Sequence, residues 1–136
     1  MKAATLWVVV LGCVFATTAA GTEVDPFSDK GLYLSCTGRD AHYRGSLASP
    51  NAKVRKLGRS IGLLKCANYL AGLTDMNDWV AERGGAPEFC VPAGTVGAEL
   101  AATYARWFEA HAPATVRLGR RSAAINALAR TYPCDR

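Results

Sequence analysis

The sequence has little of what an enzyme active site usually needs. Its 136 residues contain only two histidines, His42 and His111, and no motif gives either one a catalytic partner. A Gly-x-Ser-x-Gly turn, a Gly-rich phosphate loop and a helical pair of metal-binding histidines are all missing. We interpret His111 as a packing residue near a helix end, where the helix dipole also favours a positive ring. These absences argue against nucleophilic, phosphoryl-transfer and metal chemistry.

Long apolar runs are also scarce, and the one that stands out is at the N-terminus. Lys2 precedes the apolar run AATLWVVVLGCVFA, and the small residues TTAAG follow it. This order is typical of a secretory signal peptide, and the run is shorter than the roughly 20 residues that span a bilayer. We therefore predict that residues 1–20 are a signal peptide cleaved near Ala20. A lipoprotein anchored at Cys13 is a minor alternative, because residues 10–13 loosely resemble a bacterial lipobox.

The remaining residues, 21–136, show helical spacing with no convincing strand and no internal repeat, which predicts one all-α domain. We expect a compact bundle of four main helices and a fifth short one. Ser28 should cap the first helix, which ends near Gly38, and residues 38–48 read as a loop. Ser49 and Pro50 should start the second helix. Later helices should begin near Thr95, ending before Pro113, and near Val116 or Ser122, ending before Pro133.

The second helix raises a problem of length. Unbroken from residue 49 to residue 82 it would measure roughly 50 Å, more than the roughly 35 Å width of a compact domain of this size. We therefore predict a break at residues 72–75, with Thr74 or Asp75 capping a short segment that ends at residues 84–87. The apolar face before the break should be broad, with one stripe formed by Val54, Leu57, Ile61, Leu64, Asn68 and Ala71 and a second stripe beside it formed by Leu63, Cys66, Leu70 and Leu73. Gly58 and Gly62 have the spacing of small residues at a close helix contact, and Gly72 reads the same way.

Cysteine usage fits export. Cys13 is lost with the signal peptide, and four cysteines remain in the mature chain: Cys36, Cys66, Cys90 and Cys134. No two form a Cys-x-x-Cys pair, so a zinc site is improbable, and two disulfides are expected instead. Antiparallel packing of neighbouring helices favours Cys36 with Cys66 and Cys90 with Cys134, one of three possible pairings.

Charge is unevenly distributed along this chain of net charge +5. Residues 53–65 carry five bases and no acid, whereas the acids Asp75, Asp78, Glu82, Glu88 and Glu99 lie within residues 75–99 with Arg83 as the only base. The fold should have one basic and one acidic end. The basic run has no interleaved aromatics for stacking bases, so nucleic acid is an improbable partner.

The acidic residues do not form a catalytic pair by their spacing. Asp75, Asp78 and Glu82 lie three and four residues apart, so they should share one helix face rather than oppose each other across a cleft, as a glycosidase requires. Capping, a solvated face and contact with a partner all remain open for them. Trp79 and Phe89 are either core residues or part of such a contact.

Three segments behind the signal peptide resemble a known family: KCANYLAGLTD, FCVPAGTVGAEL and the C-terminal RTYPC. They resemble the Rap/Tai family of periplasmic immunity proteins. The resemblance implies a helical, disulfide-bonded protein, often a homodimer, with no catalytic residue and no cofactor. It also implies that the protein blocks the active site of a peptidoglycan amidase toxin delivered by type VI secretion. We expect toxin contact at Asp75, Asp78, Trp79, Glu82 and Glu88. A small disulfide-bonded periplasmic stress chaperone is the alternative, and a cell-wall hydrolase is a third class.

Overall fold

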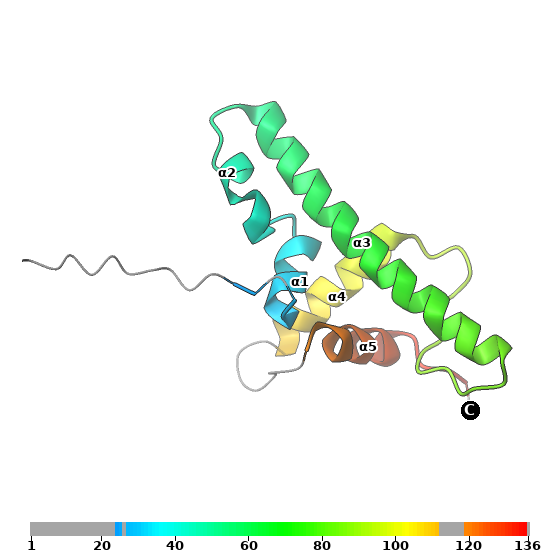
Figure 1. The fold of residues 1–136 in the computed structure, drawn as a ribbon. Coiled ribbons are helices and arrows are strands. Elements are labelled where there is room, and N and C mark those ends of the chain that lie inside the picture. Colours follow the sequence, from blue (N-terminus) through cyan, green and yellow to red (C-terminus); the bar gives the residue numbers. More distant parts are fainter. Residues whose placement is uncertain (1–23, 26, 112–118, 136) are drawn as a thin grey trace, which may run out of the picture.

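Figure 1 shows the computed structural model of the chain, in which residues 24–25, 27–111 and 119–135 are described. The predicted signal peptide, with Cys13 and the cleavage site at Ala20, lies outside these residues, as do Pro113 and Val116. In chain order the elements are α1 (Asp29–Cys36), the 3-10 turn η1 (Ala41–Tyr43), α2 (Arg44–Leu47), α3 (Ala52–Glu82), α4 (Gly97–His111) and α5 (Arg120–Thr131). The described residues hold no strand beyond an isolated bridge between Ser28 and Gly119. The all-α prediction is confirmed.

Helix α3 is the longest element, and the other helices are arranged along it. It contains 31 residues, or about 46 Å at 1.5 Å per residue. In Figure 1, α1 and α2 lie beside its N-terminal half, α4 crosses it, and α5 lies toward its C-terminal half. The predicted break at residues 72–75 is wrong. Helix α3 crosses the whole molecule, so its length is not limited by the thickness of a compact core.

The residues expected to break α3 are accommodated within it. Gly72 is exposed, and a Cβ there would meet nothing within 4 Å, so it costs only helix propensity and has no packing role. Thr74 does not cap a new helix, because its hydroxyl donates to the Leu70 carbonyl oxygen at 3.1 Å. Asp75 does not cap a new helix either, because α3 continues through it without a break. The true end comes at Glu82, followed by Gly84 in the left-handed conformation at φ 78°.

Helix starts are set by local caps, of which two differ from those predicted. The Ser28 hydroxyl accepts from the Gly31 N–H at 3.0 Å, which confirms the start of α1. Helix α3 starts at Ala52 rather than at Ser49 and Pro50, because Asn51 supplies the cap and its Oδ1 accepts from the Lys53 N–H at 2.9 Å. Thr95 does not cap α4, since its hydroxyl donates to the Pro92 carbonyl oxygen at 2.8 Å.

Residues 38–48 were predicted to be a loop, but they contain η1 and α2. The Asp40 carboxylate accepts from the His42 N–H at 2.9 Å and so starts this turn. The segment packs on the glycine face of α3. A Cβ at Gly58 would lie 2.9 Å from Cβ of Ser46, and one at Gly62 would lie 3.3 Å from Cβ of Asp40. The close-packing role predicted for Gly58 and Gly62 is confirmed.

The core lies on only part of the predicted apolar face of α3, the part that includes Cys66 and Leu70. Leu57 and Leu64 are 60% and 59% exposed, and Val54 is 38% exposed, so this part of the prediction is wrong. The buried positions of α3 are Gly58, Gly62, Cys66, Leu70 and Asn77. Cys66 and Leu70 are buried as predicted, whereas the two glycines and Asn77 could not be found by hydrophobicity. From the other elements the main buried side chains are Leu32, Phe89, Leu100, Tyr104, Ala124 and Leu128.

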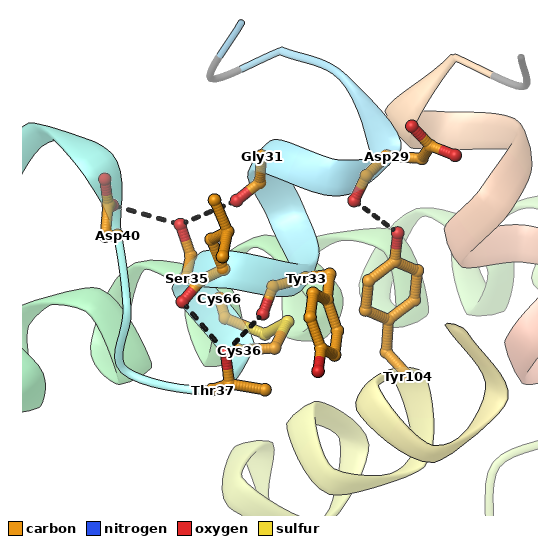
Figure 2. The surroundings of a disulfide bond; sticks show 10 residues. Asp29, Gly31, Tyr33, Ser35, Cys36, Thr37, Asp40, Cys66 and Tyr104 are labelled. Carbon is orange, nitrogen blue, oxygen red and sulfur yellow. Dashed lines mark hydrogen bonds between the residues drawn. A yellow bond between two sulfur atoms is a disulfide. The ribbon is translucent and has the colours of Figure 1, made fainter. Parts of the chain in front are cut away.

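Both predicted disulfides are present. Cys36 at the end of α1 bonds to Cys66 in α3 with the Cα atoms 5.0 Å apart, and Cys90 bonds to Cys134 with the Cα atoms 4.9 Å apart. Figure 2 shows the first bridge between α1 and α3, where the Tyr104 hydroxyl also donates to the Asp29 carbonyl oxygen at 2.9 Å. Burial raises the pKa of Tyr104, so this donor stays protonated. The two bridges thus fix α1 to α3 and the loop after α3 to the segment after α5.

Candidate functional site: the acidic end of α3

The five residues predicted to bind a partner are gathered at one end of α3. Asp75, Asp78, Trp79 and Glu82 lie within its last two turns and a half, and Glu88 lies in the loop that follows. All five are exposed. Their spacing of three and four residues places the helical members on one solvent-facing side. We call these five residues the acidic end of α3.

A buried asparagine holds the loop of Glu88 against the helix. The Asn77 side chain is largely buried, its amide donates to the Phe89 carbonyl oxygen at 2.6 Å, and its Oδ1 accepts from the Glu88 N–H at 2.8 Å. Phe89 is only 1% exposed, so it anchors the loop in the core and is not a contact residue. The neighbouring Cys90 is tied to Cys134. Glu88 is therefore held beside α3 by three independent constraints.

Sequence reasoning missed Asn77, although a signal for it existed. Asn77 follows Leu70 by seven residues, and Leu70 follows Cys66 by four, so all three share a helix face. The cysteine fixes that face as buried once its disulfide is assumed. A buried asparagine must find hydrogen-bond partners, and the nearest unpaired backbone is the loop after the helix.

Trp79 lies at the surface rather than in the core. Its side chain is 48% exposed, and the Arg83 guanidinium lies 4.4 Å from the centre of its ring. Such a cation–π contact restricts the ring without covering it. The acidic end therefore presents one large, half-exposed aromatic side chain among carboxylates, the residue type that most often anchors protein interfaces.

Helix stability does not explain the charges of α3. Its N-terminal turns carry Lys53 and Arg55, while Asp78 and Glu82 lie toward its C-terminus, with no acid in the first turn and no base in the last. The helix dipole favours the reverse arrangement, and each exposed charge near an end is worth about 0.3–1 kcal/mol. Asp75, Asp78 and Glu82 are also like charges three and four residues apart, which is unfavourable. The predicted basic and acidic ends are real, and each opposes the helix dipole.

These carboxylates are also not engaged inside the protein. In the part of the chain that the structure describes, the only ion pair joins Lys65 and Asp40, away from the acidic end. No histidine or thiol lies among the five residues of the acidic end. All four described cysteines are in disulfides. The arrangement presents a charged, rigid surface rather than a convergent catalytic cleft.

Neither a metal site nor a membrane-spanning helix is found in residues 24–25, 27–111 and 119–135. No three histidine, cysteine or acidic side chains there are grouped so as to hold a metal ion. None of the helices in those ranges combines the length and hydropathy that a membrane span needs.

A family model described as Rap1a immunity proteins matches residues 29–134 of the chain. The chain belongs to the Rap1a immunity protein family. The match runs from the first residue of α1 to the last cysteine, so it includes all five helices and both disulfides of this Rap1a-family protein. Searches of curated proteins and of solved structures found no significant match. Membership supports the role of an immunity protein, which binds and inhibits a cognate toxin.

Proposed function

We propose that this Rap1a-family protein is exported, does no catalysis itself, and neutralises one toxin by covering its active site with the acidic end of α3. The observation that carries the proposal is the arrangement of Asp75, Asp78, Glu82 and Glu88 around the half-exposed Trp79. These carboxylates oppose the helix dipole and have no ion-pair partner among the described residues. Because this arrangement of charges lowers the stability of the helix, we attribute it to the binding of a positively charged surface on the toxin.

The toxin that fits best is a peptidoglycan amidase delivered by type VI secretion, as the resemblance to Rap/Tai proteins implies. A hydrolase whose catalytic cysteine and histidine lie in a cleft offers a hollow for an aromatic side chain, and the proposal requires basic residues around the rim of that cleft. Carboxylates at the rim would mainly speed the encounter, whereas Trp79 would slow dissociation. The toxin acts on the cell wall, so residues 1–20 would deliver the mature domain, residues 21–136, to the periplasm.

We also propose a homodimer formed through the N-terminal half of α3. Val54, Leu57 and Leu64 share one side of this helix and are between 38% and 60% exposed. Exposed apolar side chains at helical spacing are typical of a helix that packs on another helix. A second copy related by two-fold symmetry would cover this stripe with itself. The acidic end, further along α3, would stay open to the toxin.

Capture of a toxin tests the main proposal. The exported protein should co-purify with the product of a neighbouring toxin gene and abolish its lytic activity on mixing. Replacing Asp75, Asp78 and Glu82 together by their amides should slow association about tenfold at low salt and leave thermal stability unchanged or slightly higher. Glu99→Gln, an exposed acid outside the acidic end, is the matched control and should not alter capture.

Three results would contradict the proposal. Capture could be as fast in the triple amide variant as in the wild type, which would place the contact elsewhere. Weak binding to many unrelated proteins would indicate the chaperone alternative. Cleavage of peptidoglycan by this protein alone would show an enzyme.

A further inference from the structure

A second surface feature, away from the acidic end, lies between α1, η1, α3 and α5. It is a cavity of about 590 Å³, within the range of ligand sites, and its wall includes the rings of Phe27, Tyr43 and Tyr69 and the cations Lys65 and Arg120. None of the described residues that line it is acidic. A neighbouring cavity of about 540 Å³ shares Phe27, Tyr69 and Arg120 and adds Arg121, and the described part of its wall also contains no acid. The two cavities therefore adjoin at these three shared residues, and we call the pair the cationic groove.

Arg120 is the central cation of the groove. Its guanidinium lies 4.3 Å from the centre of the Tyr69 ring and 5.1 Å from that of the Phe27 ring. Contact with aromatic faces fixes the plane of the guanidinium and leaves its N–H edge for a planar acceptor such as a carboxylate. No carboxylate among the described residues forms an ion pair with it.

Lys65 supplies a second positive charge on the α3 side. Its Nζ pairs with Asp40 at 2.9 Å and lies 5.3 Å from the centre of the Tyr43 ring. The Lys65 side chain is nevertheless 49% exposed, whereas the Asp40 side chain is buried, so the ammonium reaches the surface and its partner does not. An ammonium has three donors, and one of them is used here.

The start of α5 adds to the positive potential. This 12-residue helix begins at Arg120, and its N-cap residue, Gly119, provides no side-chain cap. A helix N-terminus carries a partial positive charge and uncapped amides that favour anions. The backbone bridge between Gly119 and Ser28 holds this end of α5 next to α1 and Phe27.

From these contacts we propose that the cationic groove binds an acidic peptide segment of a protein partner. A carboxylate would pair with the edge of Arg120, and the neighbouring apolar or aromatic side chains of the segment would lie on Tyr69, Phe27 and Tyr43. The length of the groove across two cavities and its aromatic walls favour a peptide over a small free anion, which would use neither. This inference goes beyond toxin inhibition and does not rest on it.

Fluorescence anisotropy tests the groove with a labelled, end-blocked peptide of alternating glutamate and phenylalanine residues. The mature protein should bind this peptide, and added salt should weaken the binding. The same peptide with glutamine in place of glutamate should not bind. Arg120→Gln should weaken binding about tenfold or more, as expected for losing one charge-assisted bidentate pair. Arg130→Gln, an exposed arginine of the same helix outside the groove, should change nothing.

Arg121→Gln provides a second variant in case Arg120→Gln disturbs α5, because Arg121 is exposed at the helix surface. It should also weaken binding, with an unchanged circular dichroism melting curve. The inference is overturned if the acidic peptide fails to bind, if the glutamine peptide binds equally, or if neither arginine variant has an effect. Displacement of the peptide by inorganic phosphate at the same concentration would also overturn it, since a plain anion site would then suffice. The triple amide variant of the acidic end should bind this peptide normally, which keeps the test separate from toxin capture.

Discussion

At the residue scale, Asp40 shows how a buried charge can be stabilised in a small protein. It is 4% exposed and accepts from Lys65 Nζ at 2.9 Å, from the His42 N–H at 2.9 Å and from the Ser35 hydroxyl at 3.0 Å. Figure 2 shows Asp40 and Ser35 beside the Cys36–Cys66 bridge. Burial alone would raise the pKa of Asp40, but the three donors outweigh it and hold the pKa below its ordinary value.

This depressed pKa predicts an acid-dependent loss of stability. The contribution of Asp40 should be complete above the pKa of an unfolded aspartate and should fall as the pH drops through the lower folded pKa. Asp40→Asn should lower the free energy of unfolding by about 1–3 kcal/mol at neutral pH, since Lys65 and two other donors lose a charged acceptor. Urea unfolding at neutral and acidic pH measures the free energy of unfolding. The difference in this free energy between wild type and variant should become smaller in acid. Asp78→Asn, an exposed acid in a like-charged cluster, should not destabilise. A gap that stays constant with pH would refute this account.

At the scale of elements, the structure explains which features of the fold could be predicted from the sequence. The caps and breakers at Ser28, Gly84 and Pro133 act on their own neighbours, so the helix ends beside them were predicted correctly. The number of helices also agrees, although the predicted short helix after residue 75 is part of α3 and the additional short helix is α2. The cysteines could be paired because neighbouring helices run antiparallel. The buried face of α3 was predicted only in part, because its N-terminal half packs through Gly58 and Gly62 while Leu57 faces solvent. The cationic groove was missed because Arg120 and Tyr69 meet only through the packing of α5 on α1 and α4, which in turn pack on α3.

The continuity of α3 leads to opposite effects of the same substitution at two glycines. Gly72→Ala should stabilise the protein by up to about 1 kcal/mol, because Gly72 lies in a continuous helix with open space around it. Gly58→Ala should destabilise it, because the new methyl group would lie 2.9 Å from Cβ of Ser46. Thermal unfolding of the two variants shows whether each substitution raises or lowers the stability of the protein. Destabilisation by Gly72→Ala would indicate a break in α3 near that residue.

At the scale of the whole molecule, two disulfides supplement a modest core. In the loop-entropy model, bridges that close 30 and 44 residues destabilise the unfolded chain by about 3.5 and 4 kcal/mol. They also differ in position, since the Cys36–Cys66 bridge joins the helices of the core and the Cys90–Cys134 bridge supports the loop of Glu88. Both bridges should therefore contribute to stability, but only the Cys90–Cys134 bridge should also contribute to toxin capture.

Removing each bridge by paired Cys→Ala substitution tests that separation. Loss of Cys36–Cys66 should lower the melting temperature strongly while the remaining folded protein still captures toxin at the wild-type rate. Loss of Cys90–Cys134 should also lower the melting temperature, and it should weaken capture at temperatures where the protein is fully folded. Kinetic binding assays on folded samples provide the comparison. Equal effects of both removals on capture would contradict a role for the Glu88 loop.

The proposed dimer predicts a change of mass in solution. Leu57→Glu combined with Leu64→Glu should convert a dimer to a monomer, because four buried charges would then face each other across the two-fold axis. Sedimentation equilibrium measures the mass directly. Val96→Glu is the control, because Val96 is 61% exposed and lies outside α3. A monomeric wild type would refute the dimer without affecting the toxin-binding proposal.

The order of the two sulfur bridges along the chain bears on how the protein matures. The loop closed by Cys36 and Cys66 ends before the one closed by Cys90 and Cys134 begins, so neither encloses the other. A polypeptide threaded N-terminus first into an oxidising compartment can complete the earlier loop while the later pair is still on the other side. Each cysteine then joins the next one to arrive. The native connectivity can therefore be reached by oxidation alone, with no reshuffling step.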